Sequence, residues 1–346
     1  MEENSVKQES VMEYLVKFAP VVILAGKNPL KLKRLDMKIL GIGNAIVDVI
    51  CKVNETFLSK HNLSKGNMKL IFDEKEFNEL LSNLKIEKTI SGGSVANSIV
   101  GLSQLNNKAG FIGKISDDEL GNKYEIGLKK ENVSYFYSKK KEIISTGTCL
   151  ILITPDSERT MVTFLGTAGK ISESDIDISA VKKSELLFLE GYLWDEGEPK
   201  KAFEKAIKNS NKVAMSLSDL FCVERHKKSF LELVKHRLDI TFGNEQEIMS
   251  LINGKSVNDV IEFSKKIKKL IVVTRGEKGA LAINKDKVAE CPAKDNLQIV
   301  DLTGAGDLFA GGFLHEYING RTLEESLMKG TDMSSQIIQV IGARLK

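Results

Sequence analysis

A carboxylate follows a run of small residues near the C-terminal end of the chain. The run is Gly304-Ala305-Gly306, and Asp307 comes next, ahead of an apolar stretch with the pattern of a helix. Small residues allow a tight turn, and the first turn of a helix leaves several backbone N–H groups unpaired. Such a turn can hold an anion, with Asp307 beside it as a proton acceptor. The motif predicts phosphoryl transfer to a hydroxyl, although taken alone it also fits an ordinary glycine turn with an acidic residue.

Two further groups of polar and glycine residues lie far upstream. Asn44 and Asp48 stand four residues apart just after a short apolar run, and Gly92, Gly93 and Asn97 open a helix-like segment. A carboxylate accepts hydrogen bonds and an amide both donates and accepts them, so Asn44 and Asp48 can hold vicinal hydroxyls. The alternative for Asp48 is a solvated strand residue, and the alternative for Asn97 is an amide in the first turn of a helix.

Strand-like and helix-like segments alternate through the second half of the chain. Strands are predicted at 186–189, 213–217, 240–242 and 270–273, and helices at 199–209, 223–236, 245–251 and 257–266. The alternation indicates right-handed βαβ units and a mostly parallel sheet with helices on both faces. Ligands of such sheets bind beyond the carboxyl ends of the strands, where both glycine-rich turns are expected to lie.

The motifs together resemble those of the PfkB/ribokinase family of small-molecule kinases. The Gly-Gly-x-x-x-Asn element at 92–97, the Asn-x-x-Glu element at 244–247 and the Gly-Ala-Gly-Asp element at 304–307 occur in the family's order and spacing. The resemblance extends from Met37 to the C-terminus. Two other phosphate-binding patterns are incomplete. Ile46 occupies the place of the third glycine of a dinucleotide fingerprint, which argues against a Rossmann oxidoreductase, and Met249 occupies that of the first glycine of a Walker A loop.

Within this family the chain is most similar to the adenosine kinase branch. The similarity rests on Gly147-Thr148-Cys149 and on the spacing of Asn44 and Asp48. One residue departs from the family pattern, since Leu302 stands where a threonine or another small residue is usual.

The resemblance implies an α/β fold. The expected architecture is a ribokinase-like three-layer sandwich with a mostly parallel central sheet and a small β-sheet lid over the substrate. The kinase domain would span 37–346, with the lid formed by segments near 47–72 and 134–165.

The resemblance also implies roles for the candidate site residues. Asp307 would act as the general base beside the anion-binding residues Gly304, Ala305 and Gly306, while Asn44, Asp48, Gly92, Gly93 and Asn97 would hold the acceptor. Asn244, Thr274 and Gly276 would lie on the nucleotide side. Glu247 would help to place Mg²⁺, largely through water. Asn244 and Glu247 also fit a helix-capping pattern, and Arg159 is either a phosphate contact or a surface residue.

The predicted activity is the ATP- and Mg²⁺-dependent phosphorylation of a primary hydroxyl on a ribose-containing or sugar substrate. Adenosine, giving AMP, is the favoured acceptor. The alternatives are a ribokinase- or fructokinase-like sugar kinase, a kinase of another nucleoside, and a non-catalytic protein that binds a nucleoside. A monomer or a homodimer is expected.

Composition bears on the partners and the cellular compartment of the protein. A net charge of +3 over 346 residues gives no case for nucleic acid or a membrane as partner. Four widely spaced cysteines without ligand spacing indicate a reducing cytoplasm and no structural zinc. Residues 1–36 lie outside the family resemblance, which begins at Met37. Their apolar run over 18–26 is too short to span a bilayer. They are predicted to be an extension that is packed on the surface, disordered or not native, with Met37 as the alternative start.

Overall fold

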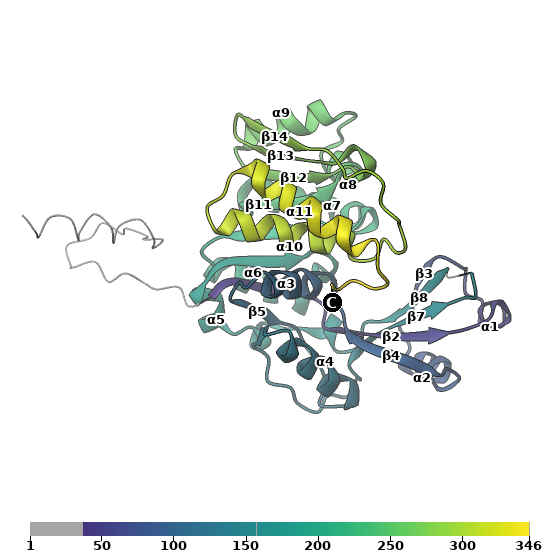
Figure 1. Ribbon diagram of the computed structural model, residues 1–346. Coiled ribbons are helices and arrows are strands. Elements are labelled where there is room, and N and C mark those ends of the chain that lie inside the picture. Colours follow the sequence, from purple (N-terminus) through teal and green to yellow (C-terminus); the bar gives the residue numbers. More distant parts are fainter. Residues whose placement is uncertain (1–36, 157, 346) are drawn as a thin grey trace, which may run out of the picture. The chain divides into compact units, whose positions relative to one another are not determined.

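Two β-sheets organise the chain in the computed structural model, which describes residues 37–156 and 158–345 (Figure 1). The larger sheet has nine strands in the order β14-β13-β12-β11-β10-β9-β1-β5-β6, and the smaller sheet has five in the order β3-β8-β7-β2-β4. The extension predicted over 1–36 lies outside the described residues.

The central sheet is mostly parallel, as predicted. Its parallel strands are β1 (Met37–Ile42), β5 (Ala109–Ile112), β6 (Ser134–Tyr135), β9 (Ser184–Glu190), β10 (Val213–Ser216), β11 (Ile240–Asn244) and β12 (Leu270–Thr274). An antiparallel pair, β13 (Ala280–Asn284) and β14 (Lys287–Cys291), completes one edge. Short apolar runs suit the parallel strands because helices cover them on both faces.

Helices cover the two faces of this sheet and bury a separate hydrophobic cluster on each. One face carries α3 (Ser94–Gln104), α4 (Glu119–Lys130), α10 (Ala305–Ile318) and α11 (Leu323–Ile337). The other face carries α5 (Ile178–Lys183), α6 (Glu198–Asn209), α7 (Leu220–His236), α8 (Glu245–Ile252) and α9 (Val257–Ile267). The three-layer α/β sandwich predicted from the sequence is therefore confirmed.

The smaller sheet projects from the carboxyl-end edge of the central sheet and forms the lid (Figure 1). Its strands are β2 (Ile46–Lys52), β3 (Met68–Leu70), β4 (Ile86–Ser91), β7 (Gly147–Ile153) and β8 (Arg159–Phe164). Helices α1 (Glu55–Lys60) and α2 (Glu74–Ser82) pack their apolar residues on one face of the lid sheet. The opposite face of the lid sheet is only half-buried along β2 and β8.

Two details of the predicted lid are wrong. Residues Ser134–Tyr135 pair with β5 in the central sheet, and strand β4 of the lid lies outside both predicted segments. The physical reason is that a half-exposed strand pattern does not tell which sheet a strand joins. Tyr135 donates a hydrogen bond of 2.6 Å to the Gly113 carbonyl oxygen, and this contact holds β6 at the edge of the central sheet.

The order in which the chain adds strands to the central sheet reverses at β1. Strand β5 lies on one side of β1 and β9 lies on the other, so the carboxyl ends of β1 and β9 flank a switch point. In open α/β sheets this is where ligands bind.

Candidate active site

The small-residue turn starts helix α10. Gly304 is the N-cap residue and has φ of +79°, a left-handed conformation that favours glycine. Asp307 falls in the first turn of α10, beside backbone N–H groups that have no partner within the helix. The turn therefore has the geometry of an anion site with a carboxylate at its rim.

Two side chains of α3 fix the Asp307 carboxylate. Ser94 Oγ donates a hydrogen bond of 2.6 Å to Oδ1, and Asn97 Nδ2 donates one of 3.0 Å to Oδ2. Burial raises the pKa of Asp307 to about 6, against the opposing effects of these two hydrogen bonds and of the Arg344 charge. A carboxylate with this pKa is ionised at neutral pH and is a stronger base than an ordinary aspartate.

Asp48 lies on the half-buried face of β2, close to Asp307. Its carboxylate packs against the Cα of Gly92, where no side chain could fit. Burial raises the pKa of Asp48 to about 7, and the negative charge of Asp307 acts in the same direction. The guanidinium groups of Arg344 and Arg159 oppose this shift, so two carboxylates and two arginines lie close together.

Asn44, just after β1, is paired with a carboxylate that the sequence analysis did not single out. Asn44 Nδ2 donates a hydrogen bond of 2.8 Å to Glu190, which also accepts one of 3.1 Å from the Val95 N–H. Glu190 is buried at the end of β9, and burial raises its pKa to about 7. Among the described residues, none donates a hydrogen bond to the buried Asn44 Oδ1. The Oδ1 of this amide is therefore free to accept from a ligand, and Nδ2 keeps a second N–H besides the one bonded to Glu190.

Gly93 links this pair to helix α3. It is the N-cap residue of α3, has φ of +101° and lies against the Asn44 carbonyl oxygen. The structure thus brings six predicted acceptor-side and catalytic residues together at the switch point: Asn44, Asp48, Gly92, Gly93, Asn97 and Asp307.

The half-buried face of the lid is apolar next to Asp48. Cys149 is the partner of Asp48 in the neighbouring strand, and Thr163 Oγ1 donates a hydrogen bond of 3.3 Å to its Sγ. One pair further from the root of the lid lie Ile50, Ile151 and Met161, cross-strand neighbours on the same face. These side chains form an apolar surface beside a carboxylate.

Three other large apolar side chains, those of Ile71, Leu193 and Trp194, belong to the protein core and not to this surface. Leu193 and Trp194 are buried in the cluster beneath the central sheet, where the Trp194 ring contacts Phe203 of α6. Ile71 is buried in the cluster on the other side of the central sheet, which includes the lid.

An ion pair joins the outer end of the lid to the segment before the anion-binding turn. Arg159, at the start of β8, lies 2.5 Å from the Asp301 carboxylate. No described residue accepts a hydrogen bond from Arg159 Nη2, which is buried. The sequence left Arg159 as a phosphate contact or a surface residue, and the structure places it against the anion-binding segment.

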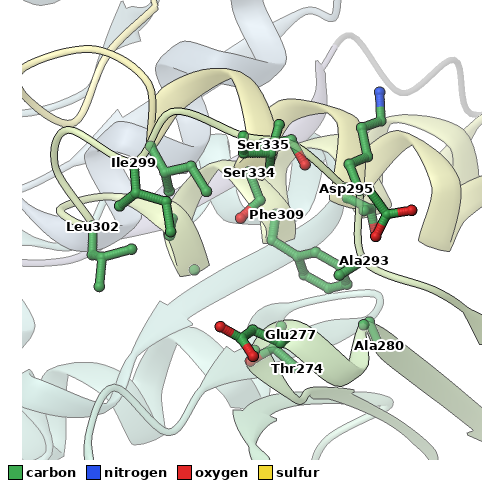
Figure 2. Close-up of a pocket in the computed structure, with 18 of the residues that line it drawn as sticks. Thr274, Glu277, Ala280, Ala293, Asp295, Ile299, Leu302, Phe309, Ser334 and Ser335 are labelled. Atoms are coloured by element: carbon green, nitrogen blue, oxygen red, sulfur yellow. The ribbon is translucent and has the colours of Figure 1, made fainter.

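A cavity of about 760 Å³ opens on the other side of the turn (Figure 2). Predicted residues Thr274, Gly276, Ala305 and Gly306 line it. Figure 2 shows Thr274 and Glu277 on one side of the cavity, facing Phe309, Ser334 and Ser335 of α10 and α11. Leu302, the residue that departs from the family pattern, is 66% exposed in the cavity wall. This volume is in the usual range for small-molecule sites.

Asn244 and Glu247 bind each other at the start of α8. Asn244 Nδ2 and its backbone N–H donate to the two carboxylate oxygens of Glu247, and Asn244 Oδ1 caps the helix by accepting from the Glu247 N–H. Burial raises the pKa of Glu247, and the charge of Asp219 adds to this effect. The capping pattern read from the sequence is therefore present.

No group of three or more acidic, histidine or cysteine side chains forms a ready metal site within the described residues. Mg²⁺ is often held mainly by substrate phosphates and water with one or two carboxylates, and Glu247 with the nearby Asp219 fits such a donor set.

Three residues of the site escaped the sequence analysis. Ser94 lay inside a quoted motif but was given no role, and Glu190 was visible only as a carboxylate just after the strand predicted at 186–189. Arg344 gave no signal at all. It comes from the end of the chain, and its Nε donates a hydrogen bond of 3.2 Å to Asn97 Oδ1.

Comparison with known proteins agrees with this geometry. Residues 61–346 match the pfkB family carbohydrate kinase. The chain is 27% identical over 335 residues to adenosine kinase 2 of Arabidopsis thaliana. The alignment covers 88% of this chain and 94% of that protein.

Two solved structures are similar over nearly their full length. The adenosine kinase from Sinorhizobium meliloti is 34% identical with a TM-score of 0.81, covering 89% of this chain and 96% of that one. A probable sugar kinase protein from Rhizobium etli is 33% identical with a TM-score of 0.80, covering 89% and 94%. The ribokinase-like fold predicted from the sequence is confirmed. The chain therefore belongs to the pfkB family of carbohydrate kinases, and it is a phosphotransferase that moves a phosphoryl group from ATP to an alcohol of a small molecule.

Proposed function

We propose that this kinase phosphorylates the primary hydroxyl of a nucleoside, with adenosine as the favoured acceptor and AMP as the product. The observation that supports this most is the Asp307 carboxylate, fixed by Ser94 and Asn97 at the first turn of α10, between Asp48 on one side and the cavity lined by Thr274 on the other. A base placed between two binding regions suits transfer from one ligand to the other.

Asp307 acts as the general base. Its carboxylate accepts the proton of the acceptor hydroxyl as that oxygen attacks the terminal phosphorus of ATP, and the bond from this phosphorus to the bridging oxygen of ADP breaks. The N–H groups of the 304–307 turn stabilise the negative charge on the transferred group. Base catalysis of this kind contributes a rate factor of about 10²–10⁴.

The acceptor is held at the switch point. Asp48 accepts hydrogen bonds from vicinal hydroxyls of the sugar, and the free Oδ1 of Asn44 accepts another. Gly92, Gly93 and Asn97 complete this side, because the glycines let the backbone come close to the ligand and Asn97 holds the base.

ATP occupies the cavity next to the turn. Thr274 and Gly276 contact the nucleotide, while Ala305 and Gly306 border its phosphates. Asn244 caps α8 and holds Glu247, which together with Asp219 would orient Mg²⁺ through water. When bound, Mg²⁺ neutralises charge on the phosphate oxygens.

The choice of a nucleoside over a free sugar rests on the lid. Ile50, Ile151 and Met161 give its half-buried face an apolar surface one strand pair away from Asp48, where a purine ring would pack. The similarity to adenosine kinases supports the same choice. A sugar kinase is the second candidate, favoured by the similarity to the Rhizobium etli protein.

Steady-state kinetics with adenosine, inosine, ribose and fructose, at one ATP and Mg²⁺ concentration, tests the proposal. We expect kcat/KM for adenosine to exceed that for either sugar at least about tenfold, which needs about 1.4 kcal/mol of extra transition-state binding. A higher value for ribose or fructose would refute the nucleoside assignment and leave the chemistry at Asp307 intact.

The remaining predictions concern partners, assembly and location. The substrates are ATP and one small molecule, and no helix in residues 37–345, as far as these are described, is long and apolar enough to cross a membrane. A monomer or a lid-paired homodimer is to be distinguished by sedimentation, and the cytoplasmic location by imaging of a tagged protein.

A further inference from the structure

The last described residues of the chain lie across the anion-binding turn. The Gly342 N–H donates a hydrogen bond of 2.7 Å to Asp301, and Gln104 Nε2 at the end of α3 donates one of 3.1 Å to the Leu345 carbonyl oxygen. Between these contacts, Ala343 packs on Gly304 so closely that a Cβ on the glycine would lie 2.7 Å from the Ala343 Cα. The backbone around Arg344 is therefore fixed on both sides.

From this position the Arg344 side chain enters the active site. Its Nε donates a hydrogen bond of 3.2 Å to Asn97 Oδ1, and Asn97 in turn donates to Asp307. The contact fixes the orientation of the amide, because the oxygen faces the guanidinium and the Nδ2 faces the carboxylate. A chain of two hydrogen bonds thus connects the C-terminal segment to the base.

The Nη2 nitrogen of Arg344 has no hydrogen-bond acceptor among the described residues, although it is buried. A buried N–H of a charged group is costly to leave unpaired, so a buried donor beside the proposed acceptor residues indicates an acceptor atom of the ligand. Arg344 is also the strongest opposing charge on Asp48, which places the guanidinium on the acceptor side of the site.

Resting on the proposed function, we propose that Arg344 is a positioning residue of the phosphoryl transfer. It orients Asn97, and through it Asp307, and its Nη2 binds an oxygen of the acceptor. The ligand class is a polyhydroxylated acceptor, since the groups near the guanidinium include the Asp48 and Asp307 carboxylates, the Asn97 amide and the Tyr124 hydroxyl, all of which can bind hydroxyls. The C-terminal segment is then part of the active site.

The charges that face Asp307 decide what removal of the guanidinium does. Asp48 of β2 and Glu190 of β9 are carboxylates near Asp307, and Arg344 is the cation that lowers the pKa of Asp307. Without this cation the pKa of Asp307 rises, so a higher pH is needed to ionise the base. A residue with a merely structural role would not shift this pH dependence.

The experiment compares the full-length wild type with Arg344→Met, Arg344→Lys and the control Arg321→Met, which changes an exposed arginine paired with Glu316. KM for ATP and for the best acceptor of the panel, the pH profile of kcat/KM and the melting temperature are measured for each. For Arg344→Met we expect an acceptor KM raised about 10- to 100-fold, an unchanged KM for ATP and an acid limb at higher pH. Arg344→Lys keeps the charge, so its acid limb stays near that of the wild type while its acceptor KM rises.

Wild-type acceptor KM and pH profile in Arg344→Met would overturn the inference, as would equal rises of both KM values. If Arg344→Met does not fold, the acceptor KM of Arg344→Lys decides, and a wild-type value refutes the inference. Failure of the wild type to phosphorylate any acceptor would refute the proposed function itself, and the role of Arg344 with it. An active wild type with unaffected variants would refute only the role of Arg344.

Discussion

The side-chain amide of Asn97 donates a hydrogen bond of 3.0 Å to the Asp307 carboxylate, although 210 positions separate the two residues in the sequence. Each stands in a helix that opens with small residues, and both helices cover the same face of the central sheet. The two glycine-rich motifs are therefore halves of one site. One half supplies the base, and the other fixes its orientation.

The first prediction concerns this base. Asp307→Asn keeps the shape of the side chain and removes its ability to take a proton, so we expect kcat to fall by about 10²–10⁴ while ATP still binds. Asp286→Asn, which changes an exposed carboxylate between β13 and β14, is the matched control. Turnover of purified Asp307→Asn at the wild-type rate would remove Asp307 from the mechanism.

The pH dependence follows from the same residue. The pKa of Asp307 is raised to about 6, and the base works only when ionised. We expect kcat/KM for the acceptor to be constant well above neutral pH and to fall as the pH drops through about 7 and then about 6, where first Asp48 and then Asp307 takes up a proton. A profile that stays flat down to pH 4.5, near the ordinary range of aspartate, would contradict the buried, shifted carboxylate.

The ionised Asp48 carboxylate is expected to lower the free energy of unfolding, although it serves acceptor binding. Its pKa is raised from 3.8 to about 7 in the folded protein, so the folded state holds this proton more tightly than the unfolded state between those values. Its contribution to stability is present below pH 4 and is lost as the pH rises through about 7. We therefore expect Asp48→Asn, which cannot ionise, to melt at a higher temperature than the wild type at pH 8.

The same variant tests the role of Asp48 in binding. Loss of the carboxylate should raise KM for the acceptor at least about tenfold and leave KM for ATP within about twofold, because the nucleotide cavity lies on the other side of the turn. At pH 5, where wild-type Asp48 is protonated, the difference in melting temperature should shrink. Equal effects on both KM values, or a lower melting temperature at pH 8, would contradict this placement of Asp48.

Local patterns and the family resemblance together predicted the layers of the fold, and they named candidate site residues that the structure brings together. The parallel strands are short apolar runs, and the small-residue turn before Asp307, taken together with the upstream motifs, indicates an anion site, so both are visible in the sequence. Asn44 and Asp48 were also found, because their spacing follows a predicted strand. Their partners were not: Glu190 reaches Asn44 only because β9 folds beside β1.

The remaining features depend on long-range packing. Strand β6 has the same half-exposed pattern as a lid strand, and only its pairing with β5 assigns it to the central sheet. In the sequence, Arg344 cannot be told from a surface arginine. In the structure, the contacts of Gly342 and Ala343 hold the backbone so that the Arg344 side chain reaches Asn97. No sequence window contains that information, because each contact joins the C-terminal segment to a turn about 40 residues away.

The N-terminal boundary can be tested by deletion. Strand β1 begins at Met37, which is itself buried, and both sheets lie within the described residues that follow. We expect a chain of residues 37–346 to fold, to melt within a few degrees of the full-length protein and to keep its kcat. A large drop in melting temperature would show that residues 1–36 stabilise the kinase domain.

The last prediction concerns the apolar face of the lid. Met161 of β8 is the cross-strand partner of Ile151, and Cys149, two residues before Ile151 in β7, is the partner of Asp48. The purine of a nucleoside would pack on this surface. Met161→Glu places a charge there, and burying it against a purine costs binding free energy that a free sugar does not incur. We expect kcat/KM for adenosine to fall at least about tenfold and that for ribose to change less than about twofold, since even about 1.4 kcal/mol lost in the transition state gives the larger factor. Met161→Leu keeps the surface apolar and serves as the matched control. If Met161→Glu lowers both values equally, the lid closes over the acceptor without recognising its base, and discrimination between nucleoside and sugar must arise elsewhere.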